Sequence, residues 1–410
     1  MEGNSNNRKR FIVIGGGAAG FFAAVNAARL HPDLEVMIIE KSGKLLSKVK
    51  VSGGGRCNVT HACFDISQMI RRYPRGAAFL KKSFHHFFTT DTIEWFKERG
   101  VLLKTEADGR MFPVTDSSQT IMNCLLAEAT KYHVDIRLNR EVKNLEHSNS
   151  GFLLHFSDGN ILKADAVCVA CGGFPKASMF DWLRATGHRI IEPVPSLFTF
   201  NLPSHPINKL MGVSVEEARV KISGTKMEES GPLLITHWGL SGPAVLRLSA
   251  WGARELADQQ WRFSIQVNWL PAFNENSLRE HFQELRFSIA AQKIGQKTVF
   301  GLPARLWEFL LQQSGISDDI RWADLPSKDQ NKLIKHLVQW EASVEGKTTF
   351  KEEFVTAGGI ALNEVDPNSM MSKLVPGLFF AGEILDIDGV TGGFNFQNAW
   401  TTGMLVARHV

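Results

Sequence analysis

The pattern of apolar and polar positions is clearest near the N-terminus. Residues 11–14 are a continuous apolar run, which is typical of a strand buried on both faces of a parallel sheet. Glycines follow, residues 18–30 predict an apolar helix, and residues 36–39 predict a second strand that ends on Glu40. The pattern therefore predicts a complete βαβ unit.

Helical periodicity dominates the next segment. Residues 79–132 predict two helical stretches joined by a loop at 108–113, and the second opens at an N-cap cluster, residues 116–118. Residues 152–156 and 161–162 then predict a hairpin with an Asp-Gly turn, which leads into a strand at 166–170. We expect this β-meander to cover one face of a nucleotide-binding domain.

The composition changes near residue 192. Seven of the ten tryptophans lie between there and about residue 350, which is enough apolar surface for a separate core. Alternation at 263–269 predicts a strand, and capping boxes opening at Ser277 and Ser327 predict helices, the second with an apolar stripe that includes Trp340. We expect an α+β unit with its strands first and its helices after them.

A nucleotide-type pattern returns at the C-terminus. Residues 377–383 predict another buried strand with a glycine turn, and a final helix follows residues 388–395. The predicted fold is α/β: a split Rossmann-like domain, with a parallel sheet and a β-meander, interrupted by an α+β insert. The expected bounds are 1–192 and 353–410 for the split domain and 193–352 for the insert.

Composition narrows the class of protein. The 46 basic and 42 acidic residues give a net charge of +4 without a long basic run, so we expect no nucleic-acid partner. Five cysteines at irregular spacing favour reduced thiols. The apolar run at 11–28 follows basic residues, but its glycine spacing argues against a signal peptide or membrane anchor. We therefore expect a cytoplasmic protein that does not enter a membrane; its oligomeric state stays open.

The first glycine cluster carries the strongest chemical signal. Gly15, Gly17 and Gly20 directly follow a predicted strand and open a helix, and Glu40 ends the next strand. Free N–H groups at a helix N-terminus suit a pyrophosphate, and an acid at the position of Glu40 suits ribose hydroxyls. The alternative is a glycine turn that binds nothing.

Three further segments carry weaker signals. Residues 52–58 hold a second glycine cluster that is either a surface loop or a flat surface against a planar ligand, with Arg56 and Asn58 as donors. Cys168 and Cys171 have redox spacing, but residues three apart on a strand point to opposite faces, so we interpret them as structural. His237 is either an acid–base residue or a structural histidine. No residue cluster has metal-ligand spacing.

The motifs together resemble the BaiN-like, aminoacetone-oxidase-like group of FAD-dependent oxidoreductases. The matching segments run the length of the chain, and the specific ones are Ser-Gly-Gly-Gly-Arg-Cys-Asn at 52–58 and the glycine-rich segment 382–393. The sequence departs from that group at residues 46–47, at His61 and at 171–173.

The resemblance implies non-covalently bound FAD, and an insert with a small β-barrel and a helical part. It places Glu40 on the adenosine ribose, Val142 near the adenine, and Glu383 at the ribityl chain. An N-terminus of the final helix beside the flavin would stabilise the negative charge of its reduced form. The cofactor-binding candidates are Gly15, Gly17, Ala18, Ala19, Gly20, Glu40, Lys41, Lys48, Ser52, Gly53, Gly54, Asn58, Val142, Cys171, Gly172, Gly382, Glu383, Gly393, Asn395 and Phe396.

The expected function is an oxidoreductase in which FAD exchanges a hydride with a small organic substrate or with NAD(P)H as a transient electron donor. Arg56, Arg110 and His237 are the candidates for substrate contacts or proton transfer. Two alternatives stay open: a flavoprotein that modifies or binds RNA, and a non-enzymatic nucleotide-binding sensor. The sequence leaves open whether the enzyme is an oxidase or a reductase.

Overall fold

The computed structural model describes residues 8–148, 150–296, 298–349 and 355–410. The chain divides into two compact units. Unit 1 comprises residues 1–196 and 350–410, and unit 2 comprises residues 197–349. Each unit is described by itself.

Unit 1 is built on a parallel sheet with the strand order β20-β10-β1-β2-β6. The side chains at 11–14, 36–39, 167–169 and 378–380 are buried, as the continuous apolar runs predict. The carboxyl ends of β1, β2 and β10 therefore share one edge. The strands are β1 (Arg10–Ile14), β2 (Glu35–Ile39), β6 (Asp135–Arg137), β10 (Ala166–Val169) and β20 (Leu378–Phe380).

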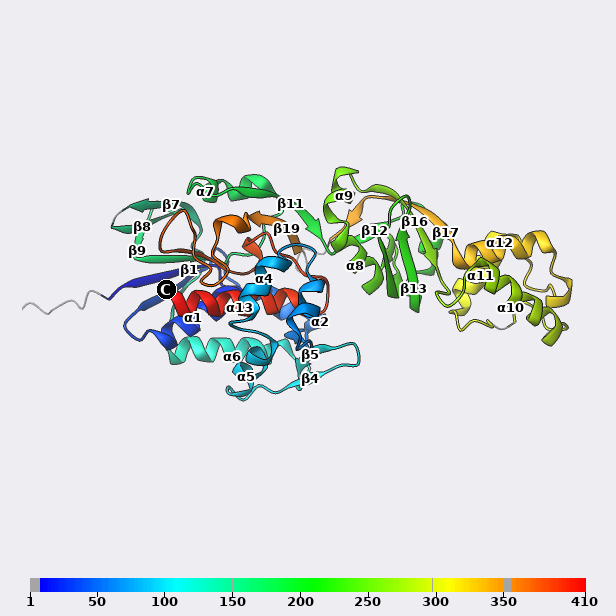
Figure 1. The fold of residues 1–410 in the computed structure, drawn as a ribbon, viewed down its shortest axis with the longest axis horizontal. Helices are drawn as coiled ribbons and strands as arrows, with labels where there is room; N and C mark the ends of the chain where they lie inside the picture. Colours follow the sequence, from blue (N-terminus) through cyan, green and yellow to red (C-terminus); the bar gives the residue numbers. More distant parts are fainter. Residues whose placement is uncertain (1–7, 149, 297, 350–354) are drawn as a thin grey trace, which may run out of the picture. The chain divides into compact units, whose positions relative to one another are not determined.

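Two helices from opposite ends of the chain lie side by side against this sheet (Figure 1). They are α1 (Ala18–Leu30) and α13 (Phe394–His409). Gly403 allows the close approach, because a Cβ there would lie 2.8 Å from the Ala19 carbonyl oxygen. Helix α6 (Ser118–Lys131) packs beside α1, and its N-cap Ser117 accepts from Gln119 N.

The predicted β-meander is present. Strands β7 (Val142–Ser148), β8 (Gly151–Phe156) and β9 (Ile161–Ala164) form an antiparallel sheet, which lies on the side of the parallel sheet away from α1 and α13 (Figure 1). The turn at residues 157–160 connects β8 to β9, as expected from its Asp-Gly sequence.

The segment between β2 and α6 is more broken than predicted. In place of one helical stretch it holds α4 (Ala77–Phe84) and α5 (Thr89–Lys97), and the expected loop at 108–113 is largely strand β5. The pairing of β5 with the nearby β4 and with β3, which lies about 50 residues earlier, explains this difference, because strand pairing is not visible in the local apolar pattern. The other elements are α2 (Ser47–Gly55), β3 (Thr60–His61), α3 (Ile66–Met69), β4 (Leu103–Thr105), β5 (Arg110–Pro113) and α7 (Asp181–Arg184).

Strands β11 (Ile190–Ser196) and β19 (Val355–Ile360) form an antiparallel pair in unit 1. Ser196 pairs with Val355, so the chain leaves unit 1 and returns to it at neighbouring positions.

Unit 2 contains an antiparallel sheet with the order β17-β16-β13-β14-β15-β12-β18. Its two outer strands are consecutive in the chain and are separated by Gly346 alone, so the sheet curls until its edges meet, as in a barrel. The strands are β12 (Thr199–Asn201), β13 (Ser214–Ile222), β14 (Glu228–Ile235), β15 (Gly239–Ser241), β16 (Arg262–Asn268), β17 (Trp340–Glu345) and β18 (Lys347–Thr348).

The helices of unit 2 pack with this sheet around Trp269, Trp307, Trp322 and Trp340, all of which are buried. They are α8 (Pro243–Trp251), α9 (Ala253–Asp258), α10 (Glu275–Ser288), α11 (Ala304–Ser314) and α12 (Ser327–Val338).

Three expectations for unit 2 are wrong. Ser277 is the third residue of α10 and not its N-cap, because Asn274 caps the helix. Ser327 is the first residue of α12 and makes no side-chain cap. Trp340 begins a strand, so the sheet is completed after the helices rather than before them.

Candidate functional site

The glycine turn after β1 forms the centre of the candidate cofactor site. A Cβ on Gly15 would lie 2.4 Å from the Ala170 carbonyl oxygen, and one on Gly20 would lie 1.9 Å from the Gly15 carbonyl oxygen. Packing within the protein therefore explains these two glycines. Gly17 differs, because no described atom lies within 4 Å of the position a Cβ would take. Its face is open, as close approach of a ligand requires.

Helix α1 begins without a side-chain cap from any described residue. The N–H groups of its first turn, at residues 18–20, are therefore available to an anion, and the helix dipole favours negative charge there.

Glu40 follows β2 beside this turn. Its Oε2 accepts from Gly16 N at 2.9 Å, and its Oε1 accepts from Ser42 N and Ser42 Oγ, both at 2.8 Å. A carboxylate has about four acceptor sites, so one stays available for a ribose hydroxyl. The turn and the acid together fit the pyrophosphate and ribose of a dinucleotide.

Glu383 lies at the same edge of the sheet, just after β20. Its Oε2 is 2.6 Å from Lys48 Nζ, and its Oε1 accepts from Thr356 N at 2.9 Å. The structure thus brings together two candidates that are distant in sequence. It also adds Thr356, which the sequence reasoning did not single out as a site residue. The buried Thr356 Oγ1 has no hydrogen-bond partner among the described residues. A Cβ on Gly173 would lie only 2.4 Å from this oxygen, so glycine is needed there.

Cys171 and Gly172 follow β10 next to Gly15. Both Cys168 and Cys171 are free thiols. Burial raises the pKa of the Cys171 thiol to about 12 and also raises that of Cys168. Neither is a thiolate at neutral pH, which agrees with a structural interpretation.

Residues 52–58 are partly buried: Gly54 and Gly55 are exposed, whereas Cys57 and Asn58 are buried. Helix α2 kinks through Ser52, Gly53 and Gly54, and Gly53 lies against the Phe112 ring. With its amide oriented to satisfy both groups, Asn58 donates to the Thr60 carbonyl oxygen at 3.0 Å and accepts from Gly393 N at 2.9 Å. Asn58 thus attaches this segment to the start of α13.

The start of α13 is held by several such contacts. Asn395 exchanges two 2.8 Å hydrogen bonds with the backbone of Gly389. Tyr73 Oη donates to the Phe394 carbonyl oxygen at 2.7 Å, and the Phe396 ring stacks on Trp400. No described side chain caps this helix, so its first-turn N–H groups are available in the same way as those of α1.

The remaining cofactor candidates lie farther along the same domain. Lys41 follows Glu40, and its Nζ lies 5.5 Å from the centroid of the Phe174 ring. Val142 is buried at the start of β7. Gly382 packs against Ala19, and its N–H donates to Thr402 Oγ1 at 2.9 Å.

Arg56 and Arg110 meet at one carboxylate. Glu106 is 2.6 Å from Arg56 and 3.0 Å from Arg110, and the Phe112 ring lies beneath both guanidinium groups. The hydrogen bond to Glu106 raises the pKa of Arg56. Arg110 lies opposite His61 in the β3–β5 pair, and His61 stacks on Phe394 at the start of α13. The two arginines therefore belong to the surroundings of that helix end.

His237, the third catalytic candidate, belongs to unit 2. It lies between β14 and β15, with its ring centroid 3.8 Å from that of Trp238. No described residue gives the His237 ring a serine hydroxyl or carboxylate as a hydrogen-bond partner.

Asp388 lies in the glycine-rich segment before α13. Its side chain is fully buried, forms an ion pair with Arg75, and accepts from Ser196 Oγ at 2.8 Å. Burial raises the pKa of its carboxyl group. The pairing joins the loop before α13 to the end of β11.

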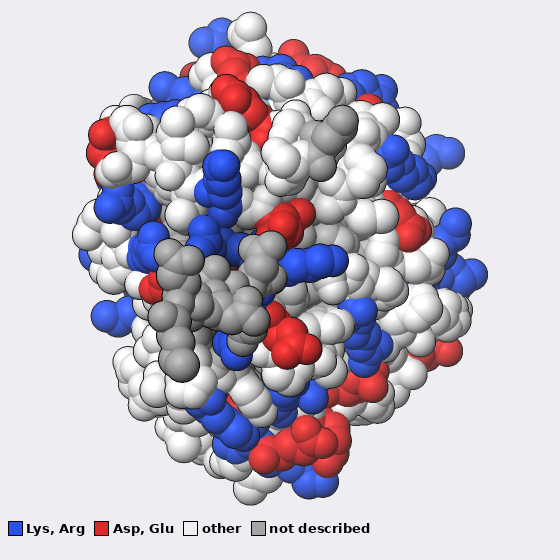
Figure 2. All heavy atoms as spheres, turned by 90° about the vertical axis from the view of Figure 1, so that its left-hand side faces the viewer, with Lys and Arg blue, Asp and Glu red and all other residues white. Residues whose placement is uncertain are grey.

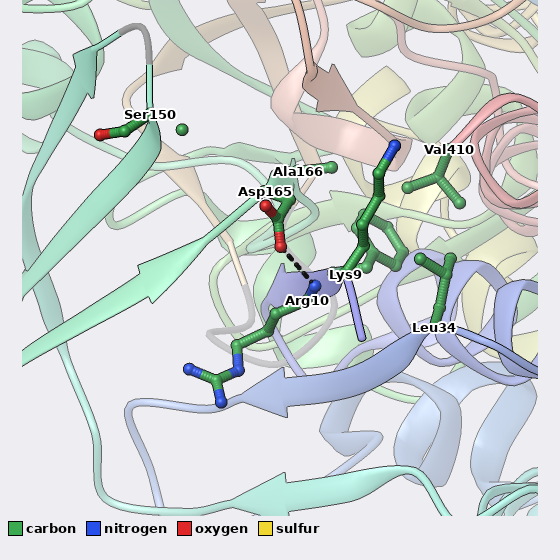
Figure 3. Close-up of a pocket in the computed structure, with 9 residues that line it drawn as sticks. Lys9, Arg10, Leu34, Ser150, Asp165, Ala166 and Val410 are labelled. Carbon is green, nitrogen blue, oxygen red and sulfur yellow. Dashed lines mark hydrogen bonds between the residues drawn. The ribbon is translucent and has the colours of Figure 1, made fainter. Parts of the chain in front are cut away.

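A cavity of about 470 Å³ lies at the opposite edge of the parallel sheet, where β1 and β10 begin (Figure 3). It is therefore separate from the candidate cofactor site. Its lining residues are Lys9, Arg10, Phe11, Leu34, Ser150, Gly151, Asp165, Ala166 and Val410.

No group of three or more His, Cys, Asp or Glu residues that could hold a metal ion occurs among the described residues, and no helix within them is long and apolar enough to cross a membrane.

These features define a nucleotide-binding fold of the FAD-dependent oxidoreductase class, and comparison with known proteins agrees. Residues 9–409 match the family described as the HI0933-like protein Rossmann domain. The chain belongs to this family of FAD-dependent oxidoreductases. A quinol fumarate reductase from E. coli has the same fold, with a TM-score of 0.50 and 14% identity over 97% of this chain and 70% of that chain.

Two curated relatives match over almost their whole length. A 3-dehydro-bile acid delta(4,6)-reductase from Clostridium scindens is 30% identical, covering 97% of this chain and 98% of the relative. A ribosomal RNA dihydrouridine synthase from Escherichia coli is 31% identical, covering 97% of this chain and 96% of the relative.

Proposed function

We propose that the protein reduces a carbon–carbon double bond conjugated to a carbonyl group, with FAD as the hydride carrier. The observation that carries this proposal is what two relatives have in common. The name of one denotes reduction of a 3-oxo steroid diene, and the name of the other denotes saturation of the uracil C5–C6 bond. Both are reductions of an alkene activated by a carbonyl.

The candidate site suits this reaction. Bound FAD, once reduced by NAD(P)H, would supply a hydride to the β-carbon and return to its oxidised form, and the α-carbon would take a proton from the solvent or from a protein group. The N-terminus of α1 and Glu40 would hold the pyrophosphate and ribose, while Lys48 and Glu383 would orient the ribityl chain. The N-terminus of α13 would lie beside the flavin pyrimidine, where it stabilises negative charge.

Arg110 is our candidate for binding the substrate carbonyl. It is about two-fifths exposed, and a guanidinium has five N–H donors, which is more than its bonds to Glu106 and Asp108 use. Its permanent positive charge would polarise the carbonyl oxygen without a proton transfer. The Glu106 carboxylate fixes its orientation.

The test uses the purified protein under anaerobic conditions. The protein is first titrated with NADH and with NADPH, and flavin reduction is followed by absorbance. The reduced protein is then mixed with a 3-oxo-4-ene steroid, with 2-cyclohexenone and with a saturated ketone as the control. We expect the enones alone to reoxidise the flavin and to gain two hydrogens by mass spectrometry. Reoxidation by oxygen but by no alkene contradicts the proposal and indicates an oxidase.

A uridine base in RNA is the second candidate substrate, and the 31% identity to the E. coli dihydrouridine synthase favours it. The surface charge gives no further support for an RNA substrate. Figure 2 shows basic and acidic side chains interspersed on the face it draws, without a continuous basic stripe. Unmodified transcribed ribosomal RNA in the same anaerobic assay separates the two candidates, because dihydrouridine is detected by mass spectrometry of nucleosides. Turnover of RNA with none of the enones assigns the RNA reaction.

A further inference from the structure

His61 makes two contacts with the segment that begins α13. Its ring stacks on Phe394 with centroids 4.6 Å apart and planes 28° apart, and its Nδ1 is 3.0 Å from the Gly392 carbonyl oxygen. A carbonyl oxygen can only accept, so Nδ1 must carry the hydrogen. Burial lowers the pKa of His61, which keeps the ring neutral at pH 7.

These contacts complete a set of attachments on the loop at residues 389–394. Asn395 bonds the backbone at Gly389, Asn58 accepts from Gly393 N, and Tyr73 donates to the Phe394 carbonyl oxygen. His61 alone of these four bonds the backbone of Gly392. The loop leads directly into the uncapped first turn of α13, so its position sets where those N–H groups point.

We propose that His61 is a positioning residue for the flavin. Its Nδ1–H bond fixes the Gly392 carbonyl and thereby the N-terminus of α13, so that the helix stabilises the reduced, negatively charged cofactor more than the oxidised one. The inference rests on the placement of the flavin in the proposed function. The charges of Arg72, Asp108 and Arg110 also interact with the His61 ring. The test is therefore run at a single pH, which keeps the protonation of the ring constant.

Two variants of His61 separate its contacts. His61→Phe keeps an aromatic ring against Phe394 but has no donor for Gly392. His61→Asn loses the ring but keeps a side-chain N–H at the position of Nδ1. His147 provides the matched control, because it is an exposed histidine of β7 whose ring lies 4.8 Å from that of Phe152, and His147→Phe removes the same type of side chain elsewhere.

The readouts are the dissociation constant of FAD and the midpoint potential of the bound flavin, measured with a reference dye. We expect His61→Phe to weaken binding of reduced FAD relative to oxidised FAD about tenfold, which makes the two-electron potential more negative by about 30 mV. We expect His61→Asn and His147→Phe to keep the midpoint potential within about 10 mV of the wild-type value. A threefold change in the affinity for reduced FAD relative to oxidised FAD would shift the potential by about 15 mV.

A His61→Phe holoprotein with the wild-type potential overturns the inference, and so does an equal shift in His61→Asn. His61→Leu, which has neither ring nor donor, is measured in parallel and gives the same decision if the phenylalanine variant does not fold. The proposed function fails in a different way, through a wild-type protein that takes up no FAD or transfers no hydride from it.

Discussion

Gly17 offers a direct test of the cofactor site, because the protein itself gives no reason for a glycine there. Its φ is −92°, which any residue adopts, and no described atom lies within 4 Å of a Cβ at this position. We therefore expect Gly17→Ala to fold normally and to bind FAD poorly.

The size of each effect can be worked out from the structure. Alanine is a poorer N-cap than glycine by about 0.5–1 kcal/mol, but it lowers the entropy of the unfolded chain, which returns about 0.4–1 kcal/mol. The net change in the free energy of unfolding is then within about 1 kcal/mol. A methyl group at Gly17 displaces a phosphate from the first-turn N–H groups, and losing one charge-assisted hydrogen bond costs about 1.5–3 kcal/mol. That corresponds to a dissociation constant for FAD that is about 10- to 100-fold larger.

Gly20→Ala is the contrasting variant. Its new Cβ would lie 1.9 Å from the Gly15 carbonyl oxygen, so we expect it to destabilise the fold by more than about 2 kcal/mol. Stability is measured by urea unfolding of the apoprotein, and affinity by quenching of FAD fluorescence. Wild-type FAD affinity in Gly17→Ala, or destabilisation equal to that of Gly20→Ala, would refute the reasoning.

Three other predictions concern groups that the structure buries. Asp388→Asn leaves Arg75 with a neutral partner, so we expect a loss of about 2–4 kcal/mol in urea unfolding, and a loss below about 1 kcal/mol contradicts the buried ion pair. Cys168→Ala leaves the rate of flavin reduction within about twofold of the wild type, since its buried thiol is not ionised, and a lost reduction step in stopped-flow absorbance would indicate a dithiol relay. Burial lowers the pKa of several histidines, so below about pH 6.5 the unfolded chain binds more protons than the folded chain. We therefore expect thermal unfolding to show that stability falls as the pH drops from about 6.5 towards the folded-state pKa values. Constant stability down to about pH 5 contradicts this. These histidines are His61, His188, His205 and His336.

Local signals were sufficient for the parts of the fold that depend on neighbouring residues. The apolar runs and the glycine turn located β1, α1 and β2, and Ser117 was found as an N-cap because capping acts within one turn. The prediction failed where pairing between strands decides the structure. Residues 110–113 were assigned to a loop, but they form β5 by pairing with β3 and β4.

The same limit applies to the candidate site. Glycine spacing indicated the pyrophosphate turn. The contacts of Glu383 gave no such signal, because Lys48 lies 335 positions and Thr356 lies 27 positions before it. His61 and Asp388 gave no pattern that distinguishes them from surface residues. His61 contacts Phe394 and Asp388 pairs with Arg75, and a single sequence contains no periodic signal for such pairings.

The split of unit 1 does not disturb the geometry that the cofactor requires. The two helix N-termini proposed to hold its ends belong to α1 and α13, and these helices are fixed to each other by the close packing of Gly403 on Ala19. The chain leaves unit 1 after Ser196, and Ser196 pairs across β11 and β19 with Val355, which lies just after the chain has returned to unit 1. The insert is therefore attached to unit 1 at two neighbouring positions, while the packing of α1 on α13 lies entirely within unit 1.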